Sequence, residues 1–377
     1  MRSKLGALLA VMVLALFVTG AARADLAWHL DAIRWEQAVT DARWADAIAF
    51  GQGQSIAIFD TGIDTDHLLL GGRSVTGHNF VSGELSPRPR WADANGHGSA
   101  VASVAAGSSA WLSTGTEIAG VAPLADLVAV RVLDAGGAGG FDSINAGLAW
   151  LIDRVSAGQI DLRAVNMSFG TEEVFTVPAS VGGPVVDAFN QHVLTLRDLG
   201  IPVIAASGNG GSGTGLAFPA ISEHVISVGA IRPDGSFANF SNRNAALDLA
   251  APGRNIWGAY AGLDVGPDDL VAQWNGTSFA APQVAGAVLL VNEVFEAAHG
   301  RLPAHDELLT LLRTSETTVV DTATGLTVPR LDLFAALEAA HVPEPGAVVV
   351  MMVVFVVGVV ARPRGRGVCR RDASLVG

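Results

Sequence analysis

Three residues of types that cooperate in nucleophilic catalysis each lie next to an apolar or small-residue segment of this chain. Asp60 ends the apolar run "SIAIFD", His97 begins "HGSAVASVAAG", and Ser278 begins "SFAAPQVAG". A serine hydroxyl becomes a strong nucleophile when an imidazole takes its proton, and a carboxylate holds that imidazole in the required tautomer. The oxyanion formed by the attack needs hydrogen-bond donors, and Asn209, in the turn "SGNGG", offers an amide. These residue types, in the order Asp, His and Ser, predict a catalytic triad with an oxyanion hole.

Taken singly, each of these four residues also has a structural explanation. Asp60 fits a turn aspartate, His97 a structural histidine beside glycines, and Asn209 a turn position in the left-handed conformation. Ser278 fits an ordinary hydroxyl at the start of a buried Ala/Gly helix. The triad interpretation therefore depends on the elements that bring the four residues together.

Short apolar runs rich in β-branched residues alternate with helical stretches along the body of the chain. The runs are bounded by Gly, Pro or Asp and predict buried strands at 55–60, 126–133, 162–168, 201–207 and 224–230. Helices are expected near 97–107, 141–156, 184–199 and 278–298. Continuous apolar strands with helices between them are typical of a parallel sheet covered on both faces. Active sites of such α/β proteins lie at the carboxyl ends of the strands, where Asp60, His97 and Ser278 can converge.

Nine stretches of the chain, over about residues 50–295, resemble the subtilisin-like serine proteases, the subtilases. They are "IAIFDTGID", "NGHGSAVASVAAG", "AGVAPLADLVAVRVL", "VNMSFG", "PVIAASGNGG", "VISVGAI", "FANFSN", "LDLAAPG" and "NGTSFAAPQVAGA". The resemblance implies the subtilisin-like three-layer α/β fold, with a mostly parallel central sheet and helices on both faces. It also implies a serine endopeptidase that hydrolyses a polypeptide substrate through an acyl-enzyme intermediate. Asp60 would be the orienting acid, His97 the general base and Ser278 the nucleophile. Asn209 and the backbone N–H of Ser278 would form the oxyanion hole.

The same resemblance places the segments that bind the substrate. Gly139-Gly140-Phe141 and Ser168-Phe169-Gly170 match the two edge segments that pair with the substrate backbone by strand addition. The turn Gly208-Asn209-Gly210 matches the lining of the first specificity pocket. Because no charge is evident in this turn, we expect an uncharged, large apolar side chain before the scissile bond.

Three departures from the family pattern bear on the chemistry. Ser99 stands where threonine is usual and keeps the hydroxyl, so little change is expected. Phe279 follows the nucleophile where methionine is common, which removes an oxidisable thioether. Leu69 stands where many members have a calcium-binding aspartate, and an apolar side chain cannot ligate a hard cation. We therefore expect no required cofactor and no strong calcium site at this position, and leave calcium elsewhere open.

Charge is unevenly distributed along the 377 residues. The formal net charge is −13, but residues 25–343 alone carry 15 basic and 34 acidic groups, a net of −19. Nucleic-acid binding needs a basic face, so this balance argues against a nucleic-acid partner. The one cysteine, Cys369, lies in the basic tail, so the body has neither disulfides nor a cysteine metal site.

Both ends of the chain have the patterns of targeting signals. Residues 1–24 combine a basic start, an apolar core and Ala22-Arg23-Ala24, which predicts a signal peptide cleaved before a catalytic domain at 25–341. Residues 342–377 resemble a PEP-CTERM sorting tail, with Pro343-Glu344-Pro345, an apolar helix at 346–361 and a basic cluster. This resemblance implies an exosortase-type sorting enzyme as partner and a membrane contact through the helix. We expect export across the inner membrane to the cell envelope or the extracellular space, with the helix available as a membrane anchor.

Three alternatives compete with an exported endopeptidase. A non-catalytic binding protein on a decayed protease fold would usually have lost a triad residue, and none is lost here. Peptide-bond formation or ester cleavage would use the same triad, so the sequence does not separate them from hydrolysis. A sedolisin-like acid protease would have glutamate at the position of His97, which disfavours that alternative.

Overall fold

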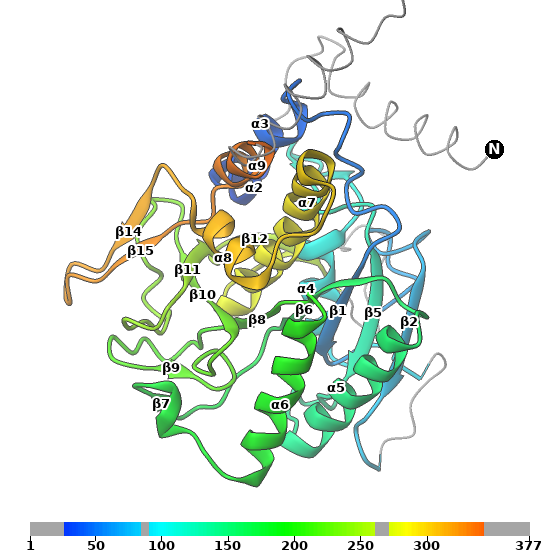
Figure 1. Cartoon of the computed structure of the whole chain (residues 1–377), viewed down its shortest axis with the longest axis vertical. Coiled ribbons are helices and arrows are strands. Elements are labelled where there is room, and N and C mark those ends of the chain that lie inside the picture. The colour runs from blue at the N-terminus through cyan, green and yellow to red at the C-terminus, as the bar shows by residue number, and fades with distance from the viewer. Residues whose placement is uncertain (1–25, 84–89, 261–270, 343–377) are drawn as a thin grey trace, which may run out of the picture. The chain divides into compact units, whose positions relative to one another are not determined.

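The computed structural model describes residues 26–83, 90–260 and 271–342, which are coloured in Figure 1. By its internal contacts the chain divides into two units, Met1–His341 and Val342–Gly377, and all the described helices and strands lie in the first. The predicted signal peptide and, apart from Val342, the predicted PEP-CTERM tail lie outside the described residues. Both stay predictions.

Among the described residues, seven parallel strands form the central sheet (Figure 1). Hydrogen-bonded neighbours follow the order β11–β10–β8–β6–β1–β5–β2, and every neighbouring pair is parallel. In chain order the strands are β1 (Ser55–Asp60), β2 (Val75–Asn79), β5 (Asp126–Arg131), β6 (Leu162–Met167), β8 (Val203–Ala206), β10 (Val225–Ile231) and β11 (Leu249–Pro252). The predicted parallel sheet is confirmed, and each of the five predicted strands is part of it.

The strands β2 and β11 are in the sheet but not among the predicted ones. β2 lies at one edge, and its residues are half-buried or exposed, so it lacks the continuous apolar run of the inner strands. β11 is buried but has only four residues and ends in Pro252, at the opposite edge, where a missing backbone N–H is tolerated. Short or half-exposed edge strands carry too little periodicity to be recognised from sequence.

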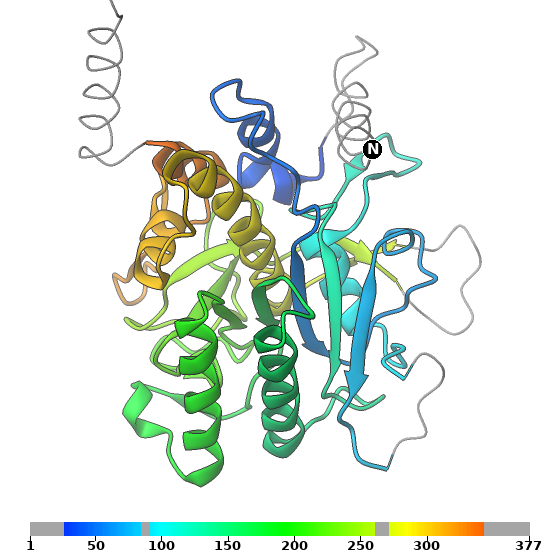
Figure 2. The same ribbon diagram turned by 45° about the vertical axis from the view of Figure 1, so that its right-hand side comes forward.

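Helices cover both faces of the sheet, as the alternation of side chains along β1 indicates. Two alternate β1 residues pack in one core with residues of α4 (His97–Ala106) and α7 (Ala281–His299). The β1 residues that point to the opposite face, Ala57 and Phe59, pack in a second core with α5 (Phe141–Ser156) and α6 (Pro184–Asp198). Figure 2 shows α5 and α6, in green, side by side on their face. Helices, sheet and helices make three layers, which confirms the predicted fold class.

The remaining elements surround these layers. The shorter helices are α2 (Trp28–Ala32), α3 (Trp35–Thr40), α8 (His305–Arg313) and α9 (Leu333–His341), with 3₁₀ turns η1 (Pro178–Ser180) and η2 (Thr277–Phe279). Within the described ranges, four two-stranded sheets pair β3 (Ala110–Trp111) with β4 (Glu117–Ile118), β7 (Val174–Phe175) with β9 (Leu216–Ala217), β12 (Ile256–Ala259) with β13 (Val271–Trp274), and β14 (Thr318–Val320) with β15 (Thr327–Pro329). α3, near the start of the described body, packs against α9, its last helix.

Small residues let α7, the helix that follows Ser278, lie inside the fold. A Cβ atom on Gly286 would lie 2.7 Å from Val121 Cβ and 2.8 Å from the carbonyl oxygen of Ala105, so glycine is required for this close approach. In the described part of the chain, the segment Thr277–His299 is long and apolar enough to span a membrane, but its apolar stretch is wholly buried in the fold. This segment therefore belongs to the protein core.

Leu69 lies in a small apolar cluster beside the amino-terminal arm. Its side chain is buried and packs with Ala27, Ile118 and Ala259. The backbone N–H of Ala27 donates to the carbonyl of Glu117 at 2.9 Å, which joins the arm to β4. Within the described ranges, no group of three or more His, Cys, Asp and Glu side chains is placed to hold a metal ion. Apolar packing holds this part of the arm in place.

Candidate active site

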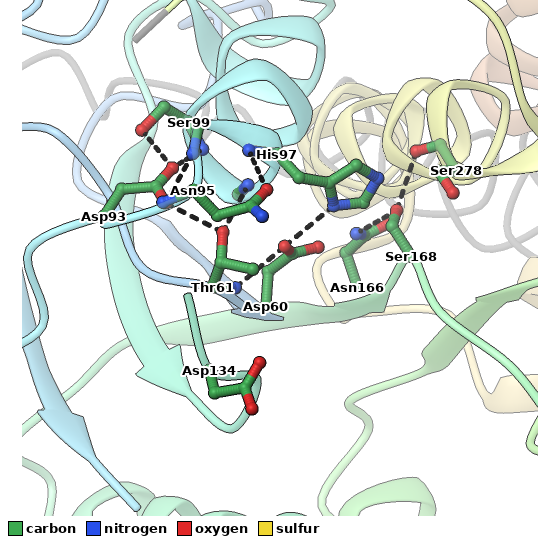
Figure 3. Close-up of polar contacts among 12 residues, drawn as sticks. Asp60, Thr61, Asp93, Asn95, His97, Ser99, Asp134, Asn166, Ser168 and Ser278 are labelled. Carbon is green, nitrogen blue, oxygen red and sulfur yellow. Dashed lines mark hydrogen bonds and ion pairs between the residues drawn. The ribbon is translucent and has the colours of Figure 1, made fainter. Parts of the chain in front are cut away.

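Asp60 and His97 are joined by a hydrogen bond at the carboxyl end of β1 (Figure 3). Asp60 is the last residue of β1 and is completely buried, and His97 is the first residue of α4. Asp60 Oδ1 lies 2.8 Å from His97 Nδ1 and also accepts a bond from Thr61 N at 2.8 Å. Since an ionised carboxylate can only accept, Nδ1 carries the proton and Nε2 keeps its lone pair. His97 is thus held in the tautomer that a general base requires.

The surroundings of His97 also set its basicity. Burial lowers the pKa of His97, but the charge and hydrogen bond of Asp60, followed by the charge of Asp93, outweigh burial and hold that pKa above its ordinary value. A raised pKa makes the neutral imidazole a stronger proton acceptor, and the same carboxylates stabilise the imidazolium that forms. The electrostatics of this site therefore favour proton abstraction by His97.

Ser278 lies in the turn η2, immediately before α7, and is largely buried. Figure 3 shows the ring of His97 between Asp60 and Ser278. The end of β6 holds the turn, because Ser168 Oγ donates to the Ser278 carbonyl at 2.7 Å and accepts from Asn166 Nδ2 at 2.9 Å. Among the described residues, His97 and the Ser278 hydroxyl share no hydrogen bond. Catalytic hydrogen bonds of this kind often tighten only when the substrate binds.

Asn209 is oriented by hydrogen bonds from the residue before the serine. Its Oδ1 accepts from Thr277 N at 2.9 Å and from Thr277 Oγ1 at 3.0 Å. With the amide oxygen engaged, Nδ2 is left to donate to another group. A Cβ atom on Gly276 would lie 3.5 Å from Asn209 Nδ2 and 3.6 Å from Ser278 N. The two predicted oxyanion donors therefore border one space, which glycine leaves open.

Asp93, which the sequence analysis did not identify, ties the segments that carry Asp60 and His97. Its Oδ1 accepts from Thr61 Oγ1 at 2.8 Å, Asn95 N at 2.9 Å and Gly96 N at 2.8 Å. Its Oδ2 accepts from Ser99 N at 2.9 Å and Ser99 Oγ at 2.7 Å. These bonds fix the residue after Asp60 and the residues on both sides of His97 against one another.

The network around Asp93 accounts for the retained hydroxyl at position 99. Ser99 Oγ donates to Asp93 and accepts from Asp64 N at 2.9 Å. Both bonds use the side-chain hydroxyl, which serine and threonine share. The signal in the sequence is an aspartate four residues before His97, in "DANGH". From sequence alone this aspartate is typical of an ordinary turn. The structure shows that its carboxylate lies beside Thr61.

A pocket of about 350 Å³ adjoins Ser278 and Asn209. It is lined by Phe169, Gly170, Thr171, Glu172, Ala206, Gly208, Asn209, Gly210, Asn242, Thr277 and Ser278. The predicted substrate-binding residues Phe169, Gly170 and Gly208 are therefore at this pocket. The expectation of an uncharged lining rested on the turn around Asn209 alone. It is corrected, because Glu172 also lines the pocket. That residue follows Gly170 by two positions, and only the folded chain brings it to the pocket.

The other predicted substrate-binding residues are placed differently. Ser168 is buried, and its hydroxyl supports the carbonyl of Ser278. Gly139 and Gly140 precede α5, and Phe141 is its first residue, with its ring 5.0 Å from the ring of Phe218. These three residues do not line the pocket described above. Their pairing with a substrate backbone stays a prediction.

Phe279, directly after Ser278, places an aromatic ring next to His97. The two ring centroids are 5.6 Å apart in an edge-to-face arrangement, and Phe279 is almost fully buried. Its other neighbour is Trp274, stacked at 5.4 Å. The residue that replaces the usual methionine thus packs against the imidazole.

Comparisons with known proteins agree with this geometry. The model of the Subtilase family matches residues 51–334. The chain is 38% identical to Subtilisin Savinase of Lederbergia lenta over 245 residues, 64% of this chain and 77% of that protein. It is 38% identical to an alkaline protease of Shouchella clausii, also over 64% of this chain but only 55% of that protein. An intracellular serine protease of Paenibacillus polymyxa is 34% identical over 263 residues, 68% of this chain and 72% of that protein. The chain therefore belongs to the subtilase family and is a subtilisin-like serine endopeptidase.

Proposed function

We propose that this chain is an exported serine endopeptidase in which Asp60, His97 and Ser278 form the catalytic triad. The observation that carries this proposal is the bond of 2.8 Å between Asp60 Oδ1 and His97 Nδ1, with the imidazole ring between that carboxylate and Ser278. The bond leaves Nε2 unprotonated on the side of the ring that faces away from Asp60. Two hydrogen-bond donors and a pocket large enough for a side chain adjoin the same serine.

In the first half of the proposed reaction, Ser278 Oγ attacks the carbonyl carbon of the scissile peptide bond while His97 Nε2 takes the hydroxyl proton. The carbonyl oxygen becomes an oxyanion, which accepts hydrogen bonds from Asn209 Nδ2 and Ser278 N. Asp60 stays ionised and stabilises the imidazolium. The imidazolium then gives its proton to the leaving amine nitrogen as the C–N bond breaks, which leaves an acyl-enzyme.

The second half reverses these roles with water as the nucleophile. His97 takes a proton from water, and the water oxygen attacks the acyl carbon to form a second oxyanion in the same donor pair. Return of the proton from His97 to Ser278 Oγ accompanies cleavage of the ester bond. The products are a peptide carboxylic acid, which loses its proton to water, and the restored enzyme, so atoms and charge balance over the cycle.

A covalent labelling experiment tests this function. The full chain, purified in mild detergent, is treated with a fluorophosphonate probe, digested and analysed by mass spectrometry. We expect the label on Ser278, because the probe requires an activated serine, and we expect parallel hydrolysis of denatured casein. Correctly folded protein that neither reacts with the probe nor hydrolyses casein would contradict the proposal and favour a binding protein on a protease fold.

We further propose export and sorting through the two ends of the chain. Support comes from the pattern of residues 1–24 and from the Pro-Glu-Pro, apolar and basic order of residues 343–377. An exosortase-type enzyme would recognise the tail, and the apolar helix would contact the membrane. Deletion of 343–377 should move the protein between cell fractions, whereas an unchanged distribution would refute the sorting role.

We propose that the position of Leu69 does not contribute to a strong calcium site. Support comes from the buried apolar cluster in which this side chain packs, since calcium requires oxygen ligands. We expect addition of a calcium chelator to leave the melting temperature of the purified chain within about 2 °C, a shift that corresponds to about 1 kcal/mol for a domain of this size. A larger fall would reveal a calcium site elsewhere in the chain.

A further inference from the structure

The pocket beside Ser278 contains a single ionisable side chain. Of the residues that line it in the described part of the chain, Glu172 alone carries a charge. Glu172 is exposed, and its carboxylate has no hydrogen bond or ion pair with any described residue. Its negative charge is therefore available to a group that enters the pocket.

The backbone around Glu172 is held in place on both sides. Thr171 N donates to the carbonyl of Phe218 at 2.9 Å. Thr171 Oγ1 accepts from Phe218 N at 3.1 Å and donates to the carbonyl of Glu173 at 2.7 Å. Directly afterwards β7 pairs with β9, the segment that precedes Phe218. Glu172 thus lies in a turn that hydrogen bonds hold to Phe218, directly after β9.

The rest of the pocket suits the stem of a long side chain. Phe169, Ala206 and the backbone of three glycines supply apolar or uncharged walls. A volume of about 350 Å³ lies within the range of protein ligand pockets. Lysine and arginine bury an apolar stem while their charged end stays near water. The remaining lining is polar but uncharged, with Thr171, Asn209, Asn242, Thr277 and Ser278. A pocket with apolar wall segments and one solvent-exposed carboxylate matches both parts of such a side chain.

We propose that Glu172 makes this subsite favour lysine or arginine, over a neutral side chain of similar length, in the residue before the scissile bond. This inference rests on the proposed function, because it takes the pocket beside Ser278 as the substrate subsite. Large apolar side chains still fit the pocket. The proposal changes only the expectation that the preferred side chain is uncharged. The excess of acidic groups in the body of the chain favours the approach of the same cationic substrates.

Peptide substrates that differ in one residue test the preference. They are tetrapeptide p-nitroanilides with lysine, norleucine, phenylalanine or glutamate before the scissile bond, since norleucine has the length of lysine without its charge. The enzymes are the full chain and its variants Glu172→Gln and Glu173→Gln. Glu173 is the matched control, because it is the adjacent exposed glutamate but does not line the pocket.

We expect the ratio of kcat/KM for lysine over norleucine to fall about two- to five-fold in Glu172→Gln, the size typical of a solvent-exposed ion pair. The ratio should stay unchanged in Glu173→Gln and should fall in the wild type when sodium chloride screens the charge. An equal ratio in Glu172→Gln and the wild type would overturn the proposal. An equal fall in both variants would also overturn it, because the effect would then belong to net charge.

Failure of the preference and failure of the proposed function give different results. If the wild type cleaves the phenylalanine substrate and Glu172→Gln leaves the lysine ratio unchanged, the preference alone is refuted. If the wild type cleaves none of the four substrates and takes up no fluorophosphonate label at Ser278, the proposed function is refuted and the preference with it.

Discussion

The catalytic centre and the pocket beside it are built in different ways. Asp93, next to the triad, accepts five hydrogen bonds that tie together the segments around Asp60 and His97. Glu172, on the pocket wall, has no hydrogen-bond or ion-pair partner among the described residues. The comparison indicates that several hydrogen bonds fix the segments of the proposed triad, whereas the one charged group on the pocket wall is held by no side-chain contact among the described residues. Such a side chain can change without loss of the scaffold.

This difference between the proposed catalytic centre and the pocket can be tested by enzyme kinetics. A substitution in the centre should lower kcat for every substrate, because it removes stabilisation of a transition state that all substrates share. A substitution at Glu172 should change the ratio of kcat/KM between substrates. Substitutions at Asp60, His97 and Asn209 test the expected loss of kcat, and the four p-nitroanilide substrates test the expected change at Glu172.

The largest effect is expected from loss of the base or its acid. His97→Ala and Asp60→Asn should each lower kcat by about 10⁴-fold or more, because the serine then lacks a base or the imidazole lacks the correct tautomer. Steady-state hydrolysis of the phenylalanine and norleucine substrates measures this loss. Both substrates should lose activity by the same factor, and a loss confined to one would show that these residues act in recognition.

A smaller effect is expected at the oxyanion donor. Asn209→Ala should lower kcat by about 10²- to 10³-fold with little change in KM, the range found for loss of one such donor in a subtilisin. Thr277→Val removes the hydroxyl that donates to Asn209 Oδ1 and should cost about ten-fold, since the amide stays but is less well held. If Asn209→Ala raised KM and left kcat intact, Asn209 would belong to the pocket and not to the centre.

Asp93 should affect the pH dependence of the centre. The proposed base is neutral His97, so kcat/KM should rise as pH increases through its pKa. Burial lowers that pKa, and the charges of Asp60 and then Asp93 raise it to a net value above the ordinary one. Asp93→Asn removes one of these charges and should move the acid limb of kcat/KM to lower pH, with a loss of about three- to ten-fold at the plateau. An acid limb that stays in place would leave Asp93 with a structural role alone.

The smallest effect concerns the ring beside His97. Phe279 has no sulfur to oxidise, so brief treatment with hydrogen peroxide should leave kcat unchanged. Phe279→Met should retain activity within a few-fold, because it exchanges one apolar side chain for another, and should lose part of it on the same treatment. Equal sensitivity of both proteins would place the oxidised group away from the imidazole.

The sequence predicts the central sheet and the triad because both leave local signals. The inner strands are buried on both faces and therefore read as continuous apolar runs, as β1 does. Asp60 ends such a strand, and His97 and Ser278 lie at the starts of small-residue helical segments. In a parallel sheet the carboxyl ends of the strands meet, which allows groups at these positions to converge. The structure places the ring of His97 between Asp60 and Ser278.

The remaining parts depend on contacts that no local pattern reveals. β2 is half exposed and β11 is short, so neither has a recognisable period. Asp93 and Glu172 each lie in a turn, where polar residues are common, and only the folded chain shows which of them faces the site. The convergence of Asp60, His97 and Ser278 could therefore be predicted from sequence, but the hydrogen bonds of Asp93 and the charge of Glu172 at the pocket could not.

The central claim is that Ser278 is the nucleophile of a working protease. The most direct measurement compares kcat/KM of the full chain and of Ser278→Ala on the phenylalanine substrate, with melting temperature as the check on folding. We expect the wild type to cleave the peptide and the variant, folded equally well, to lose about 10⁶-fold in activity. A folded Ser278→Ala variant that cleaves the peptide at the wild-type rate would contradict this claim.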